Sequence, residues 1–291
     1  MSFTPEPAPS TPAAAGAAEP TKATKSRPLT SLRVLRKEEI SAHMIRIVAG
    51  GEGFKDFVTN DYSDRYVKIV FLLPGVTYPE PLDMARIKDL LPREHWPATR
   101  TYTVRWVDHE AQELAIDFVY HGDEGLAGPW AARAQPGDTL TFSGPGGGYA
   151  PAPDADWYLF AGDESAIPAI AASLAALPAN ARGYAFIEVA TGADVYHVQA
   201  PAGMAVTWVF RDGVAAGTSD ALVSAVQGAK WLPGTVDVFA HGERGYMKRL
   251  REVFFTDHDL ERGQVSLSGY WAQGRVEDVF QAEKRLPVGK I

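Results

Sequence analysis

The sequence predicts a two-domain β + α/β protein, in which a six-stranded antiparallel β-barrel is followed by a parallel-sheet, Rossmann-like domain. Two observations support this prediction. Short runs of alternating polar and apolar residues fill the chain from Leu29 to about Tyr149, a pattern typical of barrel strands. After Pro153, apolar runs alternate with helical stretches, which indicates a parallel sheet with crossover helices. We therefore expect domains at residues 29–153 and 154–291.

Six segments of the first domain have the length and alternation of strands. Turn residues such as Pro136-Gly137-Asp138 separate them. A Pro-rich excursion from Pro74 to Pro97, with one short helix, interrupts the series, and we expect it to form a loop near a ligand. The predicted strands are Leu32–Leu35, Met44–Ala49, Arg65–Phe71, Thr101–Asp108, Glu113–Tyr120 and Thr139–Ser143.

Five apolar runs of the second domain are predicted to be parallel strands with helices between them. The first helix is expected from about Ala166 to Leu177, with Pro168 in its first turn, where Pro is tolerated. Two further helical stretches lie near 220–227 and 246–255. The predicted strands are Trp157–Ala161, Tyr184–Val189, Val206–Phe210, Val236–Ala240 and Val265–Ser268.

Residues 1–28 are rich in Pro and Ala, with Met1 and Phe3 as their large apolar residues. Such a segment buries too little apolar surface to offset its chain entropy, so we expect a disordered tail. It lacks the basic start and apolar centre of a secretory signal. No apolar run approaches the ~20 residues of a membrane helix, so we expect a cytoplasmic protein without a membrane span.

The composition excludes several classes of function. The net charge of −8 leaves no basic stripe for nucleic acid. The chain has no cysteine, which excludes disulfides, thiolate zinc sites and cysteine-ligated iron–sulfur clusters. The His residues show no metal-binding spacing, so we expect no metal site. Any redox chemistry must therefore come from a bound organic cofactor.

The run Arg100-Thr101-Tyr102-Thr103 carries the most chemical information. Alternate strand residues share a face, so Arg100 and Tyr102 are expected to point one way and the two Thr residues the other. A flavin dinucleotide needs an aromatic ring to stack on, a hydroxyl for its ring edge and a cation for its pyrophosphate. The same run also fits an ordinary barrel strand, and alone it does not decide between the two.

Three glycine-containing segments follow. His121–Ala131 is predicted to be a turn opening a short helix, whose small residues let backbone N–H groups approach a phosphate. Gly144–Tyr149 gives no G-x-G-x-x-G register, so we predict a loop at the barrel rim. Gly162–Ser165 follows the first strand of the second domain, where open α/β sheets bind ligands. Asp163 or Ser165 is equally suited to cap the following helix.

Five stretches of the sequence occur in a characteristic order: R-T-Y-T-V-R at 100–105, D-F-V-Y-H-G at 117–122, P-G-D at 136–138, A-G-D-E-S-A-I-P-A-I at 161–170 and G-Y-W at 269–271. With them the chain resembles, over about residues 28 to 285, the siderophore-interacting proteins, which are flavin-dependent ferric-siderophore reductases of the ferredoxin-reductase-like superfamily. The resemblance implies an FAD-containing reductase that uses NADPH or NADH to reduce a ferric siderophore, and we expect a monomer.

By this resemblance, Arg100 binds the flavin pyrophosphate, Tyr102 stacks on the isoalloxazine and Thr103 lies near its N5 edge. His121 and the turn at 125–130 hold the ribityl and pyrophosphate groups. Loops after three strands of the second domain line the nicotinamide and flavin cleft. The predicted cofactor-binding residues are Arg100, Thr101, Tyr102, Thr103, Asp117, Val119, His121, Gly125, Leu126, Ala127, Gly128, Trp130, Gly162, Asp163, Glu164, Ser165, Ala166, Gly242, Glu243, Tyr270 and Trp271.

Two positions depart from the family pattern. Gly128 stands where the family commonly has Ser or Thr, so a hydroxyl contact is lost while the backbone N–H remains. His241 stands where a small residue is usual, which alters the pocket. Arg211, after the third strand of the second domain, is a candidate for pairing with a 2′-phosphate and slightly favours NADPH. A solvated loop Arg is the alternative for that residue.

A ferric siderophore is bulky and often anionic, so its reduction needs an open, positively charged surface beside the flavin edge. Lys68, in D-R-Y-V-K-I-V-F, matches a strand Lys of the family; Arg133, Lys248 and Arg275 are further candidates, with ordinary solvated charges as the alternative. The cofactor does the chemistry, so we name no catalytic acid or base. A general flavin or quinone reductase of the same fold, or a non-catalytic flavin- or siderophore-binding protein, remains an alternative.

Overall fold

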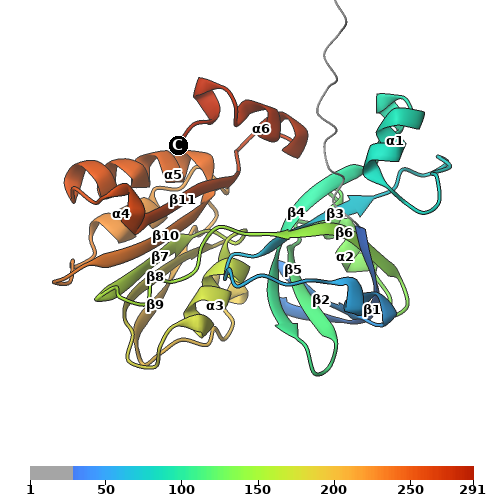
Figure 1. The fold of residues 1–291 in the computed structure, drawn as a ribbon. Coiled ribbons are helices and arrows are strands. Elements are labelled where there is room, and N and C mark those ends of the chain that lie inside the picture. The colour runs from blue at the N-terminus through green and yellow to red at the C-terminus, as the bar shows by residue number, and fades with distance from the viewer. Residues whose placement is uncertain (1–28) are drawn as a thin grey trace, which may run out of the picture.

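The structure is a computed structural model that describes residues 29–291. The tail predicted at residues 1–28 lies outside the described residues. A closed six-stranded barrel is followed by a five-stranded sheet with helices packed on both faces (Figure 1). The predicted fold class is confirmed.

The barrel is antiparallel throughout and closes in the order β1-β2-β5-β4-β3-β6. Alternation puts Val67 and Ile69 of β3 in its core. A short helix, α2 (Ala127–Arg133), packs small side chains against the same core. The strands are β1 (Leu29–Ser41), β2 (Met44–Gly50), β3 (Tyr66–Phe71), β4 (Ala98–Asp108), β5 (Glu113–Val119) and β6 (Thr139–Gly146).

The excursion between β3 and β4 forms the helix α1 (Met84–Leu90), which projects from the barrel in Figure 1. It begins where the Asp83 side chain accepts the N–H of Arg86 at 2.8 Å, an ordinary N-cap. Trp96 then closes the segment by donating its indole N–H to the Leu91 carbonyl at 3.0 Å. The short helix expected in this region is therefore present.

The second domain is a parallel sheet in the order β11-β10-β7-β8-β9. The chain builds outward from β7 to β9 and then returns to place β10 on the other side of β7. This reversal makes the carboxyl ends of β7 and β10 the place where such sheets bind ligands. The strands are β7 (Trp157–Gly162), β8 (Arg182–Val189), β9 (Gly203–Phe210), β10 (Val236–Glu243) and β11 (Val265–Trp271).

Four helices accompany this sheet. One face packs against α3 (Ile167–Ala176), and the other packs against α4 (Ala221–Gln227) and α5 (Arg244–Glu252). A further helix, α6 (Glu277–Glu283), follows β11 and was not predicted. In Figure 1 it lies on the side of the second domain that approaches the barrel.

The two domains are joined by buried polar contacts as well as by apolar packing. Ser63 of the barrel domain shares a 2.8 Å hydrogen bond with Ser173 of α3. The Tyr149 hydroxyl donates to Asp237 at 2.8 Å, and Met44 of β2 packs with the α3 face of the sheet. Because α3 lies against β4, the strand that carries Arg100 to Thr103 faces the second domain.

Within residues 29–291, no helix is long and apolar enough to cross a membrane. The same residues contain no group of three or more His, Cys, Asp or Glu side chains arranged to hold a metal ion.

Candidate active site

The Arg100–Thr103 run lies on β4 with the alternation that the sequence predicts. Tyr102 pairs with Val67, and its ring packs 4.5 Å from the Phe118 ring at an interplanar angle of 34°. Burial raises the pKa of Tyr102, and the nearby Glu277 carboxylate raises it further. The phenol therefore stays neutral, which suits a side chain whose expected role is to stack rather than to exchange a proton.

The opposite face of β4 meets the second domain. Thr103 is 7% exposed and shares a hydrogen bond with the Tyr270 hydroxyl of β11. Thr101, two residues before, pairs with Lys68 of β3, and both are exposed. The predicted ring-edge hydroxyl and the predicted substrate lysine therefore lie on the same outer face of the barrel.

Arg100 keeps a guanidinium with only weak protein partners. It donates to the Thr99 carbonyl at 2.9 Å, and its nearest carboxylate is Asp278 of α6 at 3.8 Å. That carboxylate is 85% exposed, so solvent screens the pair. The charge of Arg100 is consequently available to an anionic group in the cleft.

The turn after β5 brings His121 and the start of α2 to the same side. Gly125 has φ +80°, a conformation that favours glycine. Leu126 precedes α2 without capping it by a side-chain hydrogen bond, so the first N–H groups of the helix remain available to another acceptor. Burial lowers the pKa of His121, which favours its neutral form.

Gly128 has a steric reason for departing from the family pattern. A Cβ at this position would lie 2.9 Å from the Val119 carbonyl oxygen, which is tighter than real Cβ contacts allow. The start of α2 therefore lies too close to the end of β5 for Ser or Thr in this chain. The lost hydroxyl is the consequence of close backbone packing.

Two of the predicted cofactor residues make contacts within the barrel domain. Asp117 alternates with the core residues Ile116 and Phe118, so it lies on the outer face of β5, where it is 2% exposed and accepts the Nε and Nη2 N–H groups of Arg46 at 2.7 and 2.8 Å. Trp130 packs its ring 5.6 Å from Phe118, behind Tyr102. Direct contact of Asp117 and Trp130 with a cofactor stays a prediction, and the contacts observed here support the shape of the site.

The loops of the second domain converge at the reversal point of the sheet. Asp163 accepts the indole N–H of Trp271 at 2.8 Å and the backbone N–H of Glu243 at 2.8 Å. Glu243 in turn caps α5 by accepting the N–H groups of Gly245 and Tyr246. The predicted residues gathered here are Gly162, Asp163, Glu164, Ser165 and Ala166 after β7, Gly242 and Glu243 at the end of β10, and Tyr270 and Trp271 at the end of β11.

Arg211 does not fit the role of a 2′-phosphate ligand. It is 6% exposed and forms a bidentate pair with Glu164 at 2.6 and 2.8 Å. Glu188, fully buried, lies 3.6 Å away. Two carboxylates therefore already neutralise this guanidinium, and the slight preference for NADPH loses its support.

His241 is accommodated by aromatic neighbours. Its ring stacks on Phe239 at 3.8 Å, lies edge-on to Tyr270 at 5.0 Å and bonds Ser266 at 2.9 Å. Burial lowers its pKa to about 3. His241 is therefore a neutral side chain packed beneath Tyr270 rather than a charge in the pocket.

Two of the four candidate substrate cations are held by other groups of the protein, and two are exposed. Lys248 donates to the Val288 carbonyl at 2.7 Å, and Arg275 pairs with Glu283 at 2.7 Å, so both hold the segment that contains α6. Arg133 is exposed at the end of α2. Lys68 of β3 is exposed and pairs with Thr101 of β4, on the outer face of the barrel that also carries Thr103.

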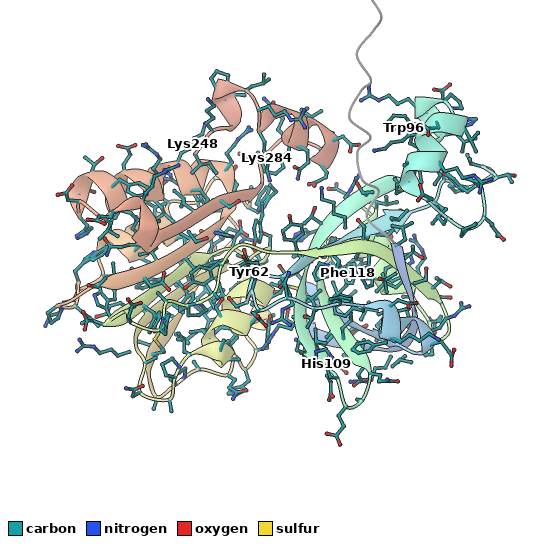
Figure 2. The ribbon with its side chains drawn as sticks, in the orientation of Figure 1. Tyr62, Trp96, His109, Phe118, Lys248 and Lys284 are labelled. Atoms are coloured by element: carbon teal, nitrogen blue, oxygen red, sulfur yellow. The ribbon has the colours of Figure 1, made fainter. Side chains whose placement is uncertain are left out.

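The sequence analysis missed Lys284, which the structure places close to Lys68. Burial lowers the pKa of Lys284, and the positive charge of Lys68 lowers it further. Figure 2 shows Lys284 where α6 approaches the barrel, whereas Lys248 lies further away on α5. No pattern in the sequence indicated this residue, because of the apolar residues Val276, Val279 and Phe280 that precede it only Phe280 is buried.

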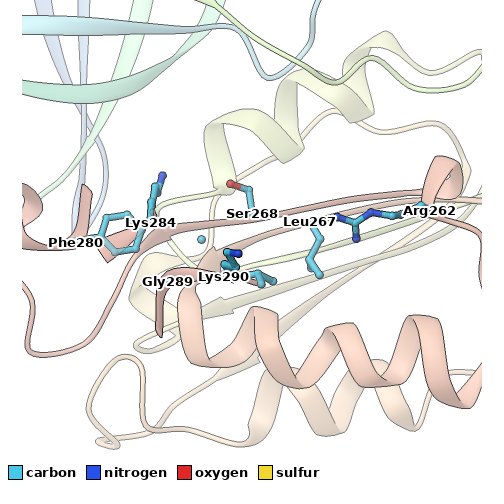
Figure 3. A pocket seen from close by; sticks show the side chains of 9 residues that line it. Arg262, Leu267, Ser268, Phe280, Lys284, Gly289 and Lys290 are labelled. Carbon is cyan, nitrogen blue, oxygen red and sulfur yellow. The ribbon is translucent and has the colours of Figure 1, made fainter. Parts of the chain in front are cut away.

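A hollow of about 370 Å³ lies between β11 and the segment after α6. Its lining includes the cations Arg262, Lys284 and Lys290 together with Ser268 and Phe280 (Figure 3). Lys284 follows α6 directly and is the cation of this hollow that also lies near Lys68, whereas α6 itself contributes the carboxylates Glu277, Asp278 and Glu283.

These residues fit a flavin dinucleotide by their chemistry. Tyr102 offers a neutral ring, Arg100 offers a weakly partnered cation, and α2 begins without a side-chain cap. Thr103 and Tyr270 close the junction between the domains. A stacking surface, a phosphate cation and ring-edge hydroxyls therefore occur together, as this cofactor requires.

Comparisons with known proteins agree with this geometry. Residues 33–149 match the siderophore-interacting FAD-binding domain, and residues 155–274 match the siderophore-interacting protein domain. An uncharacterized protein of Mycobacterium tuberculosis is 46% identical, covering 89% of this chain and 95% of its own length. A ferric vibriobactin reductase of Vibrio cholerae is 31% identical, covering 88% and 93%.

A solved structure supports the same assignment. The crystal structure of a siderophore utilization protein from T. fusca is 35% identical and superimposes with a TM-score of 0.74, covering 87% of this chain and 96% of that one. The chain therefore belongs to the siderophore-interacting protein family, and its barrel is the FAD-binding domain of that family.

Proposed function

We propose that this protein is an NAD(P)H-dependent, FAD-containing ferric-siderophore reductase, which releases iron as Fe(II) in the cytoplasm. One observation carries the proposal. The Arg100–Thr103 strand, with its ring, cation and hydroxyl, meets Tyr270 of the second domain beside the cations Lys68 and Lys284. The name of the Vibrio cholerae relative, a ferric vibriobactin reductase, agrees with this reading.

When bound, FAD supplies the chemistry of accepting a hydride from NAD(P)H and passing single electrons to Fe(III). The chain's own residues bind and orient. Arg100 and the uncapped start of α2 would hold the pyrophosphate. Tyr102 would support the ring, and Thr103, fixed by Tyr270, would lie at the ring edge. The proposed reaction includes no proton transfer from a side chain to the iron centre.

The substrate end of the cleft is defined by charge. Burial lowers the pKa of Lys284, the Glu277 carboxylate raises it, and the charge of Lys68 lowers it, so an anionic ligand between the two ammonium groups would relieve the remaining repulsion. In a chain of net charge −8, such a local positive surface would attract a ferric siderophore with acidic groups.

The nicotinamide is proposed to bind at the carboxyl ends of β7 and β10, where the strand order reverses. Because Arg211 is neutralised by Glu164 and Glu188, that residue gives no reason to prefer NADPH over NADH. We propose a monomer whose domain boundary lies between β6 and β7, and size-exclusion chromatography with light scattering tests the oligomeric state.

The function is tested with the purified protein reconstituted with FAD. NADH or NADPH is mixed with several ferric siderophores, and a chromogenic chelator reports Fe(II). A protein that binds FAD and reduces ferric siderophores faster than a simple quinone supports the proposal. Equal rates with every acceptor would favour a general flavin or quinone reductase. A protein that neither binds FAD nor consumes NAD(P)H is not a reductase of this kind.

A further inference from the structure

Asp163 lies where the strand order reverses and connects three strand ends. It is 1% exposed and follows β7 directly. Oδ2 accepts the Trp271 indole N–H and the Glu243 backbone N–H, each at 2.8 Å. Oδ1 accepts the backbone N–H of Ser165 at 3.0 Å and its hydroxyl at 2.5 Å. The ends of β7, β10 and β11 are thereby tied to one carboxylate.

The backbone at Gly242, near the end of β10, leaves room for this carboxylate. Gly242 has φ +150°, and a Cβ there would lie 2.8 Å from Asp163 Oδ2. A side chain at this position would therefore push the carboxylate away from Glu243. Gly242 is required because Asp163 approaches the end of β10 so closely.

Trp271 is the half-buried end of this arrangement. Alternation on β11 sends Tyr270 towards Thr103 of the barrel and Trp271 across the strand ends. Its ring lies against the loop before α4, where a Cβ on Gly217 would come within 3.1 Å of the indole. The indole therefore forms a wall beside the place where the nicotinamide is proposed to bind.

We propose that Asp163 is a positioning residue of the nicotinamide end of the cleft, and that its ionised carboxylate holds the Trp271 indole and the Gly242–Glu243 loop in place. The inference rests on the proposed reductase function. All four groups around the carboxylate present hydrogens to it, and an ionised carboxylate is an acceptor only. Protonation weakens this hold in either position: a proton on Oδ2 faces two N–H groups that cannot accept it, and a proton on Oδ1, which the Ser165 hydroxyl can turn to accept, leaves Oδ2 a neutral and therefore weaker acceptor.

The surroundings set the pH at which this happens. The pKa of Asp163 is raised to about 6, mainly by burial and also by the charge of Glu164, while the hydrogen bonds from Ser165 act in the opposite direction and lower it. Glu164 is paired with Arg211. Glu243 caps α5, and the Tyr270 phenol, whose own pKa burial raises, is the remaining titratable group nearby. Asp163 is therefore ionised at neutral pH and becomes protonated as the pH falls below about 6.

The first test is a double-mutant cycle on the FAD-loaded full chain. Asp163→Asn keeps the shape but offers one acceptor oxygen, and Trp271→Phe keeps a ring but removes the N–H. We expect each single variant to raise the KM for NAD(P)H about tenfold with little change in FAD content. The double variant should be no worse than either one. Asp154→Asn, an exposed linker acid, is the matched control and should behave as the wild type.

The second test does not depend on turnover. The fluorescence of Trp271 is obtained as the difference between the wild type and Trp271→Phe. It is followed from about pH 8 to about pH 4.5, a range that extends on both sides of the raised pKa of this buried carboxyl. It should change with a midpoint near the pKa of about 6. The corresponding difference in the Asp163→Asn background should stay flat.

Two outcomes would overturn the inference: additive effects of the two substitutions on KM, or a fluorescence titration that survives in Asp163→Asn. If the wild type fails to oxidise NAD(P)H at all, the proposed function fails. The fluorescence titration then still decides whether Asp163 holds Trp271.

Discussion

Lys68 and Lys284 are the single residues on which we expect substrate choice to depend. Both are exposed, Lys68 is near enough to lower the pKa of Lys284, and Lys68 pairs with the strand that carries Tyr102 and Thr103. Within residues 29–291 neither forms an ion pair, whereas Arg275 pairs with Glu283 at 2.7 Å. The Glu277 carboxylate offsets part of the charge of Lys284, and the charge of Lys68 is available to an anionic ligand.

Replacing Lys68 with Ala should raise the KM for an anionic ferric siderophore about tenfold, equivalent to roughly 1.4 kcal/mol. The rate with a neutral quinone should change little, because the flavin contacts remain. Steady-state kinetics with both acceptors measures this. Lys55→Ala is the control, since Lys55 is exposed and only loosely paired with Glu52 at 3.5 Å. Equal behaviour of the two variants would argue against a substrate role for Lys68.

Tyr102 tests the cofactor end of the same site. Tyr102→Leu removes the ring and should weaken FAD binding by about 1 kcal/mol, the usual value of an aromatic contact. Tyr102→Phe should bind FAD as the wild type does, because the raised pKa keeps the phenol neutral. Equilibrium dialysis or flavin fluorescence quenching gives both affinities. If the Leu variant retains full affinity, the ring does not stack on the flavin.

At the scale of residues, strand geometry could be predicted from the sequence, whereas pairings between side chains distant in the chain could not. The alternation of Arg100 to Thr103 follows from strand geometry and is present. Arg211 forms its ion pairs with Glu164 and Glu188, which lie at the ends of other strands. No local pattern indicates such a pairing, and neither sequence-based interpretation of Arg211, a 2′-phosphate ligand or a solvated loop residue, included it.

At the scale of elements, α6 is the part that sequence reasoning missed. Its seven residues are few for a confident helical pattern, and its stability comes from tertiary contacts. Phe280 is 1% exposed, and Glu283 accepts from Arg244 at 2.6 Å and from Arg275 at 2.7 Å. The first strand shows the same limit, because β1 continues through the charged run 36–39, beyond the predicted Leu32–Leu35, by pairing with β2.

Phe280→Ala should release α6 from the sheet, because it removes the one buried side chain of that helix. We expect faster proteolysis after Trp271 and a several-fold higher KM for the siderophore, as Lys284 loses its position, while FAD affinity is kept. Val279→Ala is the matched control, since Val279 is 45% exposed. Indistinguishable proteolysis of the two variants would contradict this account of α6.

At the scale of the whole molecule, the fold class followed from the change of period near Pro153, because a barrel and a parallel sheet bury their strands differently. The docking of the domains did not follow from the sequence. It depends on pairs such as Ser63 with Ser173 and Tyr149 with Asp237, each more than eighty residues apart. These contacts accompany the hydrogen bond that joins Thr103 of β4 to Tyr270 of β11.

Acid stability is a property of the whole molecule that His241 should influence. Its folded pKa of about 3 lies below the ordinary value of 6.5, so the unfolded chain binds more protons between these values and stability falls as the pH drops. From pH 7 to pH 4.5 this group should remove about 3 kcal/mol. Urea unfolding of the wild type and His241→Leu should show a smaller acid loss in the variant; equal losses would contradict it.

The central claim is that one cleft between two domains passes electrons from a nicotinamide to a ferric siderophore. The most direct measurement is the stoichiometry of anaerobic turnover by the FAD-loaded protein, with Fe(II) trapped as it forms. A hydride carries two electrons, so the account predicts about two Fe(II) ions for each NAD(P)H consumed. NAD(P)H oxidation without Fe(II), or bound siderophore without oxidation, would contradict it.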